Sequence, residues 1–234
     1  MKLALMQPYF FPYIGYFQLM NAVDEFVIYD NIKYTKKGWI NRNRILVNGK
    51  DSLISIPLQR DADFLDIKDR RLAKIWGSEK KTMLNRIIGA YKKAPYFDRA
   101  YPIVESCILF DDFNLFIFIF NSLCLIKEYL EIKTPFLISS SISIDHEIKA
   151  ENKVIAICKA RKADFYLNPI GGIQLYSKDR FMEQGINLHF IKTNNIIYKQ
   201  FNNDFIPFLS IIDVMMFNSK NEIKGYLNSF YTLL

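Results

Sequence analysis

Cysteine and histidine are scarce in this sequence of 234 residues, which contains three cysteines and two histidines. Cys107, Cys124 and Cys158 are odd in number and form no CxxC pair. This argues against a disulfide framework and for reduced thiols, as in a cytosolic protein. Because His146 and His189 are the only histidines, a Cys/His zinc cluster is not supported, and we expect no metal site.

Long apolar runs are also lacking. The most apolar stretch, residues 115–126, is interrupted by Asn121 and Ser122. A helix needs about 20 apolar residues to cross a bilayer, so this stretch predicts a buried helix. The start, MKLALMQPYF, carries one lysine and an apolar run too short for a signal peptide. We therefore expect a cytoplasmic protein without a membrane span.

Hydrophobic residues, at 50%, and aromatic residues, at 15%, are plentiful. A chain of this length buries roughly 70–75% of its unfolded surface, so its core needs no disulfide or metal. The net charge of +7 points to an anionic partner, such as a nucleotide, tRNA, an acidic carrier protein or a membrane surface. Lysines are scattered along the chain, so the charge by itself selects none of these, and we expect no DNA partner.

The first 30 residues predict a βαβ unit. Residues 2–6 have the pattern of a buried strand, which Pro8 ends. Residues 16–24 then predict a short helix, and residues 25–30 predict a second strand. Such a unit implies parallel strands joined by a right-handed crossover. A third strand is expected at 52–58.

Strands and helices alternate in the rest of the sequence. Helices are expected at 78–94, 101–110, 113–130, 147–162 and 177–185 and twice within 208–227, and strands at 134–141, 163–169 and 186–192. Ser78 is the expected N-cap and Gly185 the expected C-cap of their helices. The alternation predicts a three-layer, Rossmann-like α/β fold with a mainly parallel sheet. We expect a single domain over 1–234, with a helical insertion at about 70–133.

Ligands of open parallel sheets bind beyond the carboxyl ends of the strands. Four polar stretches are expected at such ends: residues 7–15, 30–44, 139–141 and 168–172. Their coincidence on one edge predicts a binding site, and the alternative is a set of ordinary surface loops.

The first of these stretches combines aromatic residues with proline and glycine. Three of its residues and the tyrosine that follows it are predicted to face a ligand: Gln7, Tyr13, Gly15 and Tyr16. Gly15 allows the backbone to approach a ligand, and the N-terminus of the following helix favours an anion. Three phenylalanines are predicted to pack in the core instead: Phe10, Phe11 and Phe17.

The other stretches supply the remaining predicted substrate-binding residues. They are Trp39, Asn41, Arg42, Arg44, Ser139, Ser140, Gly171 and Gly172. An arginine fork grips phosphate or carboxylate, and Trp39 could stack a ring, but a basic hairpin on a solvated face explains this pattern equally well. The N–H groups of a glycine turn can cradle an oxyanion, although such a turn also marks a simple tight bend.

No catalytic nucleophile stands out, because the cysteines lack a nearby histidine. Asp30 follows a strand, and Asp213 is an acidic residue in a strongly apolar helix, where a buried carboxylate needs partners. Together with Asn168 they are the predicted catalytic residues. His146 follows Asp145 and could act as a base, but a structural role is favoured.

Five stretches of the chain match a known family: MQPYFFPYIGYFQLMNAVDEFVIYD, KKGWINRNRIL, AYKKAPYF, YLNPIGG and YKQFNNDFIPFLSIIDVMMFNS. In these motifs the sequence resembles the WbqC-like protein family over nearly its whole length. The resemblance implies a role in the biosynthesis of O-antigen or another surface polysaccharide, as a glycine or amino-acid transferase that acylates amino sugars.

A remoter similarity is to the nucleotidylyltransferase-like fold, in which an HxGH loop contacts ATP phosphates before the first helix. Tyr13 and Tyr16 stand where the histidines would be, and the Ser-rich stretch 138–144 lacks the basic residue of the second motif. A similar strand order is therefore compatible with the sequence, while phosphate-transfer chemistry is disfavoured.

The resemblance leads us to expect an acyltransferase acting on a nucleotide-linked amino sugar. Asp30 or Asp213 would be the base, and Asn168 with the glycine turn at 171–172 would bind the oxyanion. Two arginines would hold phosphate and two rings would wall the sugar: Arg42, Arg44, Tyr13 and Trp39. The activated amino-acid donor could be a carrier-protein thioester, an aminoacyl-tRNA or ATP with an amino acid. Two alternatives stay open: an ATP-dependent ligase or nucleotidyltransferase, and a non-catalytic sugar- or carrier-binding protein.

Overall fold

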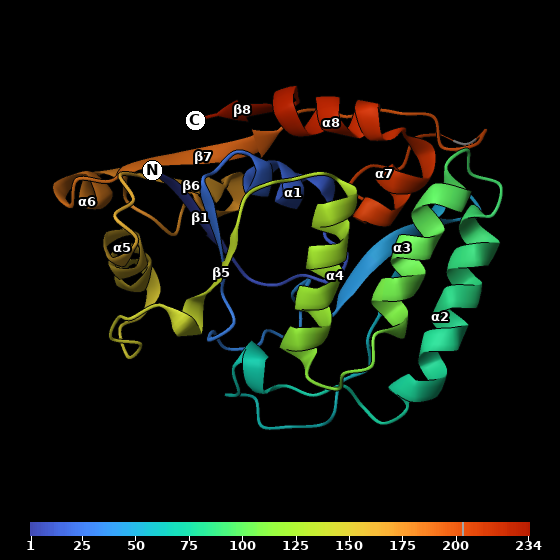
Figure 1. Cartoon of the computed structure of the whole chain (residues 1–234), viewed down its shortest axis with the longest axis horizontal. Helices are drawn as coiled ribbons and strands as arrows, with labels where there is room; N and C mark the ends of the chain where they lie inside the picture. The colour runs from blue at the N-terminus through green and yellow to red at the C-terminus, as the bar shows by residue number, and fades with distance from the viewer. Residues whose placement is uncertain (203) are drawn as a thin grey trace.

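Five parallel strands and one antiparallel strand form the central sheet of the computed structural model, which describes residues 1–202 and 204–234 (Figure 1). The strands are β1 (Lys2–Met6), β2 (Glu25–Ile28), β5 (Phe136–Ile138), β6 (Phe165–Pro169), β7 (Asn187–Thr193) and β8 (Tyr231–Leu233). Their order is β5-β2-β1-β6-β7-β8, and only β8 runs antiparallel to its neighbour. The direction of the chain across the sheet reverses between β1 and β6, as at the switch point of a Rossmann-like sheet.

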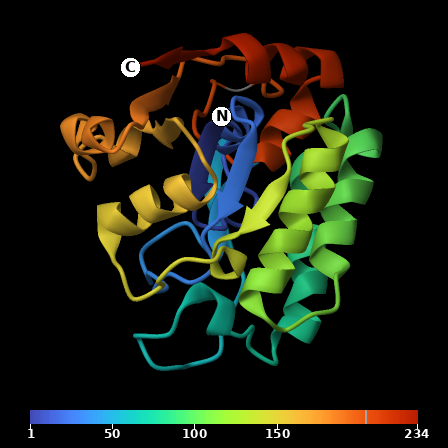
Figure 2. The same cartoon turned by 60° about the vertical axis from the view of Figure 1, so that its left-hand side comes forward.

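Helices cover both faces of this sheet and confirm the predicted three-layer α/β architecture. The helices are α1 (Ile14–Asn21), α2 (Trp76–Tyr91), α3 (Phe97–Leu109), α4 (Leu115–Tyr129), α5 (Ala150–Ala160), α6 (Lys178–Glu183), α7 (Ile211–Phe217) and α8 (Lys220–Ser229). Figure 2 shows α5 on one side of the strands and α2, α3 and α4 on the other. One apolar cluster joins α1 to these three helices, and a second joins the opposite face of the sheet to α5 and α6.

The prediction of a third strand at 52–58 is only partly right. The strand is β4 (Lys50–Ser55), and it pairs with β3 (Arg42–Val47) in a separate antiparallel hairpin. The hairpin turn is made by Asn48 and Gly49, whose φ angles are 50° and 73°. An Asn-Gly pair with two positive φ angles favours a tight hairpin, and this signal was available in the sequence.

Several helix boundaries also differ from the predictions: α1 begins at Ile14 where residue 16 was expected, and α3 begins at Phe97 where residue 101 was expected. Ser78 does not cap α2, because the helix begins at Trp76 and the Ser78 hydroxyl donates a hydrogen bond to the carbonyl of Ile75 at 2.9 Å. The indole of Trp76 is buried against Phe118, so packing of this ring extends the helix beyond the expected cap. Gly185 follows α6 with φ of 74°, which agrees with its predicted role in ending the helix.

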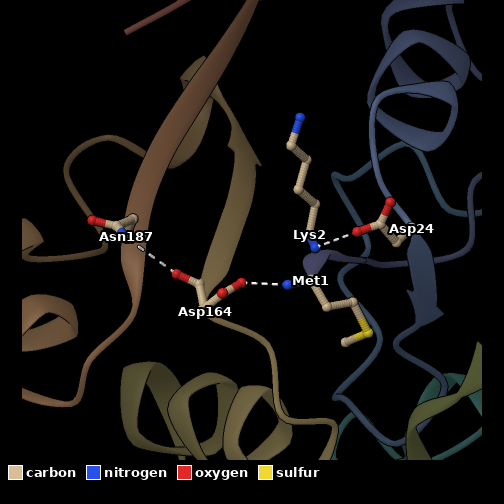
Figure 3. A network of polar contacts seen from close by, with 5 residues as sticks. All are labelled: Met1, Lys2, Asp24, Asp164 and Asn187. Carbon is tan, nitrogen blue, oxygen red and sulfur yellow. Dashed lines mark hydrogen bonds and ion pairs between the residues drawn. The ribbon is translucent and has the colours of Figure 1, made fainter.

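Polar contacts join neighbouring strands at the amino edge of the sheet, where the parallel strands begin (Figure 3). The Met1 amino group pairs with the Asp164 carboxylate. The backbone carbonyl of Asp164 accepts a hydrogen bond from the side-chain amide of Asn187 at 3.3 Å. The amide of Lys2 donates to Asp24 at 2.7 Å. These contacts tie together the beginnings of β1, β2, β6 and β7.

Within residues 1–202 and 204–234, every helix is too short or too polar to span a lipid bilayer.

Candidate functional site

The carboxyl ends of the parallel strands lie along the edge opposite Met1, which we call the carboxyl edge. Because β1, β2, β5 and β6 are parallel, this edge carries the residues at or just after their ends. Gln7 follows β1, Asp30 follows β2, Ser139 follows β5 and Asn168 lies near the end of β6. The sequence therefore placed these four predicted residues on the correct edge. Whether they bind a substrate stays a prediction.

Hydrogen bonds join the segments that follow β2 and β5. The Asp30 carboxylate accepts from the amide of Ser140 at 2.9 Å and from its hydroxyl at 2.6 Å. The Ser139 hydroxyl donates to the Asn31 side chain at 2.8 Å, and the other end of that amide lies 2.9 Å from Nδ1 of His146. Asp30 is 2% exposed, so its carboxylate holds the Ser139–Ser141 turn in place.

Lys153, which the sequence did not single out, is the least expected residue at this edge. Its side chain is 5% exposed, and Nζ donates to the carbonyls of His146 at 3.2 Å and Asn31 at 3.5 Å. Nζ also lies 5.4 Å from the centre of the Tyr29 ring. A signal was present, since Lys153 is four residues before the buried Ile157 and shares its inward helix face.

In the part of the chain that the structure describes, the ammonium of Lys153 has no ionic partner. Among the described residues, no carboxylate oxygen lies within 4.0 Å of Nζ. Burial lowers the pKa of Lys153, while the more distant carboxylates of Asp66, Asp30 and Glu147 oppose this shift. A buried ammonium is costly when it is not paired. The arrangement is therefore suited to an anionic group or to an oxygen that develops negative charge.

Asn168 and the glycine turn form a second unit at the carboxyl edge. The Asn168 side chain is 5% exposed and donates to the hydroxyl of Tyr166 at 2.8 Å. A Cβ on Gly172 would lie 2.2 Å from Oδ1 of Asn168 and 3.4 Å from the Tyr176 ring. Burial and the neighbouring Tyr176 raise the pKa of Tyr29 to about 12.

Gly172→Ala is expected to destabilise the protein by roughly 1–3 kcal/mol, because the added methyl must displace the buried Asn168 amide. Gly171→Ala is the matched control, since a Cβ at that position would have no neighbour within 4 Å, and its effect should stay within about 0.5 kcal/mol. Urea unfolding of both variants measures the difference. Equal unfolding midpoints would contradict the close contact between Asn168 and Gly172.

The aromatic stretch after β1 divides into core and edge residues. Phe10, Phe11 and Phe17 are fully buried, which confirms their predicted core positions. Tyr16 is also buried, and its hydroxyl donates to the backbone carbonyl of Gln7 at 3.0 Å. The structure thus uses this tyrosine to support the loop. Of the predicted ligand-facing tyrosines, it is Tyr13 that lines a cavity.

Gly15 has a packing role. A Cβ at this position would lie 2.6 Å from Oγ1 of Thr193, which donates to the buried Gln18 side chain at 2.7 Å. Glycine therefore lets the beginning of α1 approach the end of β7.

The four substrate-binding residues predicted in the second polar stretch lie at β3. Arg42 and Arg44 are on the strand, and Trp39 and Asn41 come just before it. The Arg44 guanidinium is 5.1 Å from the Trp39 ring centre, pairs with Asp51 at 3.0 Å and is partly committed to that carboxylate. Nε of Arg42 donates to the carbonyl of Gly38 at 2.9 Å. These residues belong to the separate hairpin, because Arg42 and Arg44 are strand residues and do not lie in the loop after β2.

Asn41 has two committed hydrogen bonds. Its Oδ1 accepts from the Tyr34 hydroxyl at 2.8 Å, and its Nδ2 donates to the carbonyl of Ile56 at 2.8 Å. The side chain also lines a cavity of about 480 Å³ together with Tyr34 and Arg70.

Asp213 lies in a buried network away from the surface. Its carboxylate, fully buried, accepts from Tyr91 at 2.9 Å, Tyr198 at 2.7 Å and Gln200 at 2.6 Å. Burial raises the pKa of Asp213, while these three donors oppose the shift. The Tyr91 hydroxyl also accepts from the amide of Leu46, so the network ties α7 to α2 and β3. The sequence predicted that a buried Asp213 carboxylate needs partners, and three side chains of the protein supply them.

The three thiols are unsuited to nucleophilic attack. Burial raises the pKa of Cys158 to about 12 and also raises the pKa values of Cys107 and Cys124. Thiols with raised pKa values carry little thiolate at neutral pH. Within the part of the chain that the structure describes, no three His, Cys, Asp or Glu side chains are arranged to hold a metal ion.

Comparison with known proteins gives one family match and one curated relative. The model of the WbqC-like protein family matches residues 7–225, a range that includes all the predicted site residues. The uncharacterized protein Rv1507c of Mycobacterium tuberculosis (strain ATCC 25618 / H37Rv) is 29% identical over 235 residues, covering 97% of each chain. No solved structure matches the chain.

Proposed function

Because the chain belongs to the WbqC-like protein family, we propose that it transfers an aminoacyl group, such as glycyl, to the amino group of a nucleotide-linked sugar in surface-polysaccharide biosynthesis. The neutral sugar amine attacks the carbonyl carbon of an activated ester or thioester. A C–N bond forms, the bond to the leaving group breaks, and the leaving group departs with the proton from the amine. The reaction needs positioning and stabilisation of the oxyanion, and no covalent enzyme intermediate.

The observation that carries this proposal is the buried ammonium of Lys153, which has no carboxylate oxygen within 4.0 Å among the described residues and lies at the carboxyl edge that also carries the Asn168–Gly172 unit. In the proposed reaction this ammonium stabilises the negative charge that develops on the carbonyl oxygen. The first N–H groups of the Ile170–Gly172 turn have no acceptor within that turn and add to the stabilisation. Positive charge preorganised in a dry site is among the strongest sources of catalysis.

The buried state of the thiols supports a direct transfer. Their raised pKa values disfavour an acyl-thioester intermediate on the enzyme, so the acceptor amine itself is the nucleophile. Asp30 contributes by fixing the Ser139–Ser141 turn next to the site through two hydrogen bonds from Ser140. We keep Asn168 in its predicted catalytic role as an oxyanion-binding residue. We give Asp213 a structural role, because its carboxylate is fully enclosed.

Mass spectrometry tests the proposed function. The purified protein is incubated with nucleotide-linked amino sugars and, in separate reactions, with an aminoacyl thioester, an aminoacyl-tRNA or an amino acid plus ATP. The expected product is a sugar nucleotide heavier by one aminoacyl residue. Release of AMP and pyrophosphate with the third donor would favour the ligase alternative. Tight sugar binding without a product from any donor would contradict the transferase and favour a binding protein.

A further inference from the structure

A cavity of about 400 Å³ lies between the beginning of α1 and the segment that follows β7, and we infer that it binds the base of a nucleotide. Its lining comes from the beginning of α1, the end of β7, the segment between β7 and α7, and α7 itself. We call it the aromatic cavity. The inference rests on the proposed function for the rest of the substrate, but nucleotide binding can be measured without catalysis.

Aromatic rings form the walls of this cavity. Tyr13 and Phe208 meet edge to face with ring centres 5.6 Å apart, and Tyr198 and Phe205 meet in the same way at 5.1 Å. Four rings from two segments far apart in the chain therefore surround one space. A planar heteroaromatic ring fits such walls because it can stack on one ring and meet others at their edges.

The deep end of the cavity is rigid and apolar. Ile14, Ile196 and Val214 are almost fully buried, and the Tyr198 hydroxyl is held by the Asp213 carboxylate at 2.7 Å. The Asp213 network therefore fixes one wall. A rigid wall reduces the conformational entropy that the protein loses when a ligand binds, which favours a specific site over a transient surface gap.

Polar groups stand at the mouth. Asn195 is an exposed amide that can donate to and accept from the edge of a base, and the exposed Asn194, whose Oδ1 accepts from Thr232 at 2.9 Å, still offers its amide N–H groups. Lys192 is exposed as well and, among the described residues, has no carboxylate within 4.0 Å. With the first turn of α1, which contains no acidic residue, this lysine makes the mouth favourable to phosphate. The combination of stacking walls, amides and a cation matches a nucleotide better than a neutral sugar or an acyl chain.

Phe208 shows that the cavity wall is held in a costly conformation. Its φ angle is 58°, a left-handed value that is unfavourable for a bulky residue, and its side chain is 63% exposed. Two hydrogen bonds just after it fix the backbone: the Ser210 amide donates to the backbone carbonyl of Arg44, and the Ser210 hydroxyl donates to that of Phe11. An exposed aromatic side chain held in such a conformation at a cavity is typical of a ligand-contacting residue.

Isothermal titration calorimetry with UDP, GDP and ribose 5-phosphate tests the inference. We expect one of the two nucleotides to bind, and ribose 5-phosphate, which lacks a base, to bind at least about 10-fold more weakly. Phe208→Ala should weaken nucleotide binding by about 10-fold, as expected for the loss of one stacking partner. The exposed side chain makes the variant compatible with folding, and Asn195→Ala gives a second variant at the mouth.

Phe64→Ala is the matched control, because Phe64 is 74% exposed and lies outside the cavity lining. Unchanged nucleotide affinity in both Phe208→Ala and Asn195→Ala would overturn the inference, as would equal affinities for ribose 5-phosphate and the nucleotides. Nucleotide binding that is lost only in the cavity variants supports it. Binding without aminoacyl transfer would count against the proposed function alone, whereas transfer with an unchanged KM in Phe208→Ala would count against the cavity alone.

Discussion

Lys153→Met is expected to lower kcat of aminoacyl transfer by roughly 10²–10³-fold, the effect typical of losing one oxyanion-stabilising group. The value of KM should change little, because the charge on the carbonyl oxygen develops only in the transition state. The variant should fold at least as stably as the wild type, since methionine fills a similar volume without a buried charge. Steady-state kinetics and thermal unfolding measure the two effects.

Lys159→Met is the control for this prediction, because Lys159 lies on the same helix, α5, and is exposed. It should leave kcat unchanged. A large loss of stability in Lys153→Met, with normal kcat in the folded fraction, would show that the lysine is structural.

The pH dependence gives an independent check on Lys153. Burial lowers the pKa of this lysine below the usual 10.5, so the catalytic ammonium is lost as pH rises through that lowered pKa, and kcat should fall there. In the interval between the lowered pKa and 10.5 the unfolded chain binds more protons than the folded one. The free energy of unfolding should therefore rise with pH across this interval. Lys153→Met should lack that rise.

Asp213→Ala is expected to cost roughly 3–5 kcal/mol of unfolding free energy, a large part of the 5–15 kcal/mol typical of a domain. The substitution leaves Tyr91, Tyr198 and Gln200 without their common acceptor inside the protein. Urea unfolding measures the loss. Asp111→Ala, at an exposed carboxylate, is the control and should change stability by less than about 0.5 kcal/mol. A similarly small effect at Asp213 would contradict the structural role.

The sign of the pH effect at Asp213 is opposite to that at Lys153. Burial raises the pKa of Asp213 above 3.8, so the folded protein binds more protons than the unfolded chain between 3.8 and the raised value. The contribution of Asp213 to the free energy of unfolding should therefore fall as pH rises through this interval. Asp213→Asn removes the titration. The free energy of unfolding is measured against pH for this variant and for the wild type. The difference between the two profiles should decrease as pH rises through the interval.

Much of the fold could be predicted because burial is encoded locally. The apolar pattern of residues 2–6 and 25–30 predicted β1 and β2, and the structure confirms both strands and their parallel pairing. The pattern of residues 30–44 left a ligand-binding loop and a basic hairpin equally open, and the structure decides for the hairpin, with Arg42 and Arg44 on β3 and a turn at Asn48-Gly49. The Asn-Gly pair that favours this hairpin is visible in the sequence.

The candidate site was less accessible to sequence reasoning, since it depends on contacts between distant residues. Asp30 meets Ser140, which is 110 positions away, and Asp213 meets Tyr91 across 122 positions. The sequence indicated that a carboxylate in an apolar helix needs partners, but local patterns do not say which residues supply them. For the same reason the pattern of α5 could place Lys153 on the inward face without showing that its ammonium lacks a carboxylate.

The sequence by itself determined the alternation of strands and helices, the edge of the sheet that carries the polar loops, and the burial of Phe10, Phe11 and Phe17. Tertiary structure alone decided which polar groups satisfy one another and which are left free for a ligand. The physical reason is that burial follows from the periodicity of neighbouring residues, whereas the partners of a buried charge are set by packing between segments far apart in the chain.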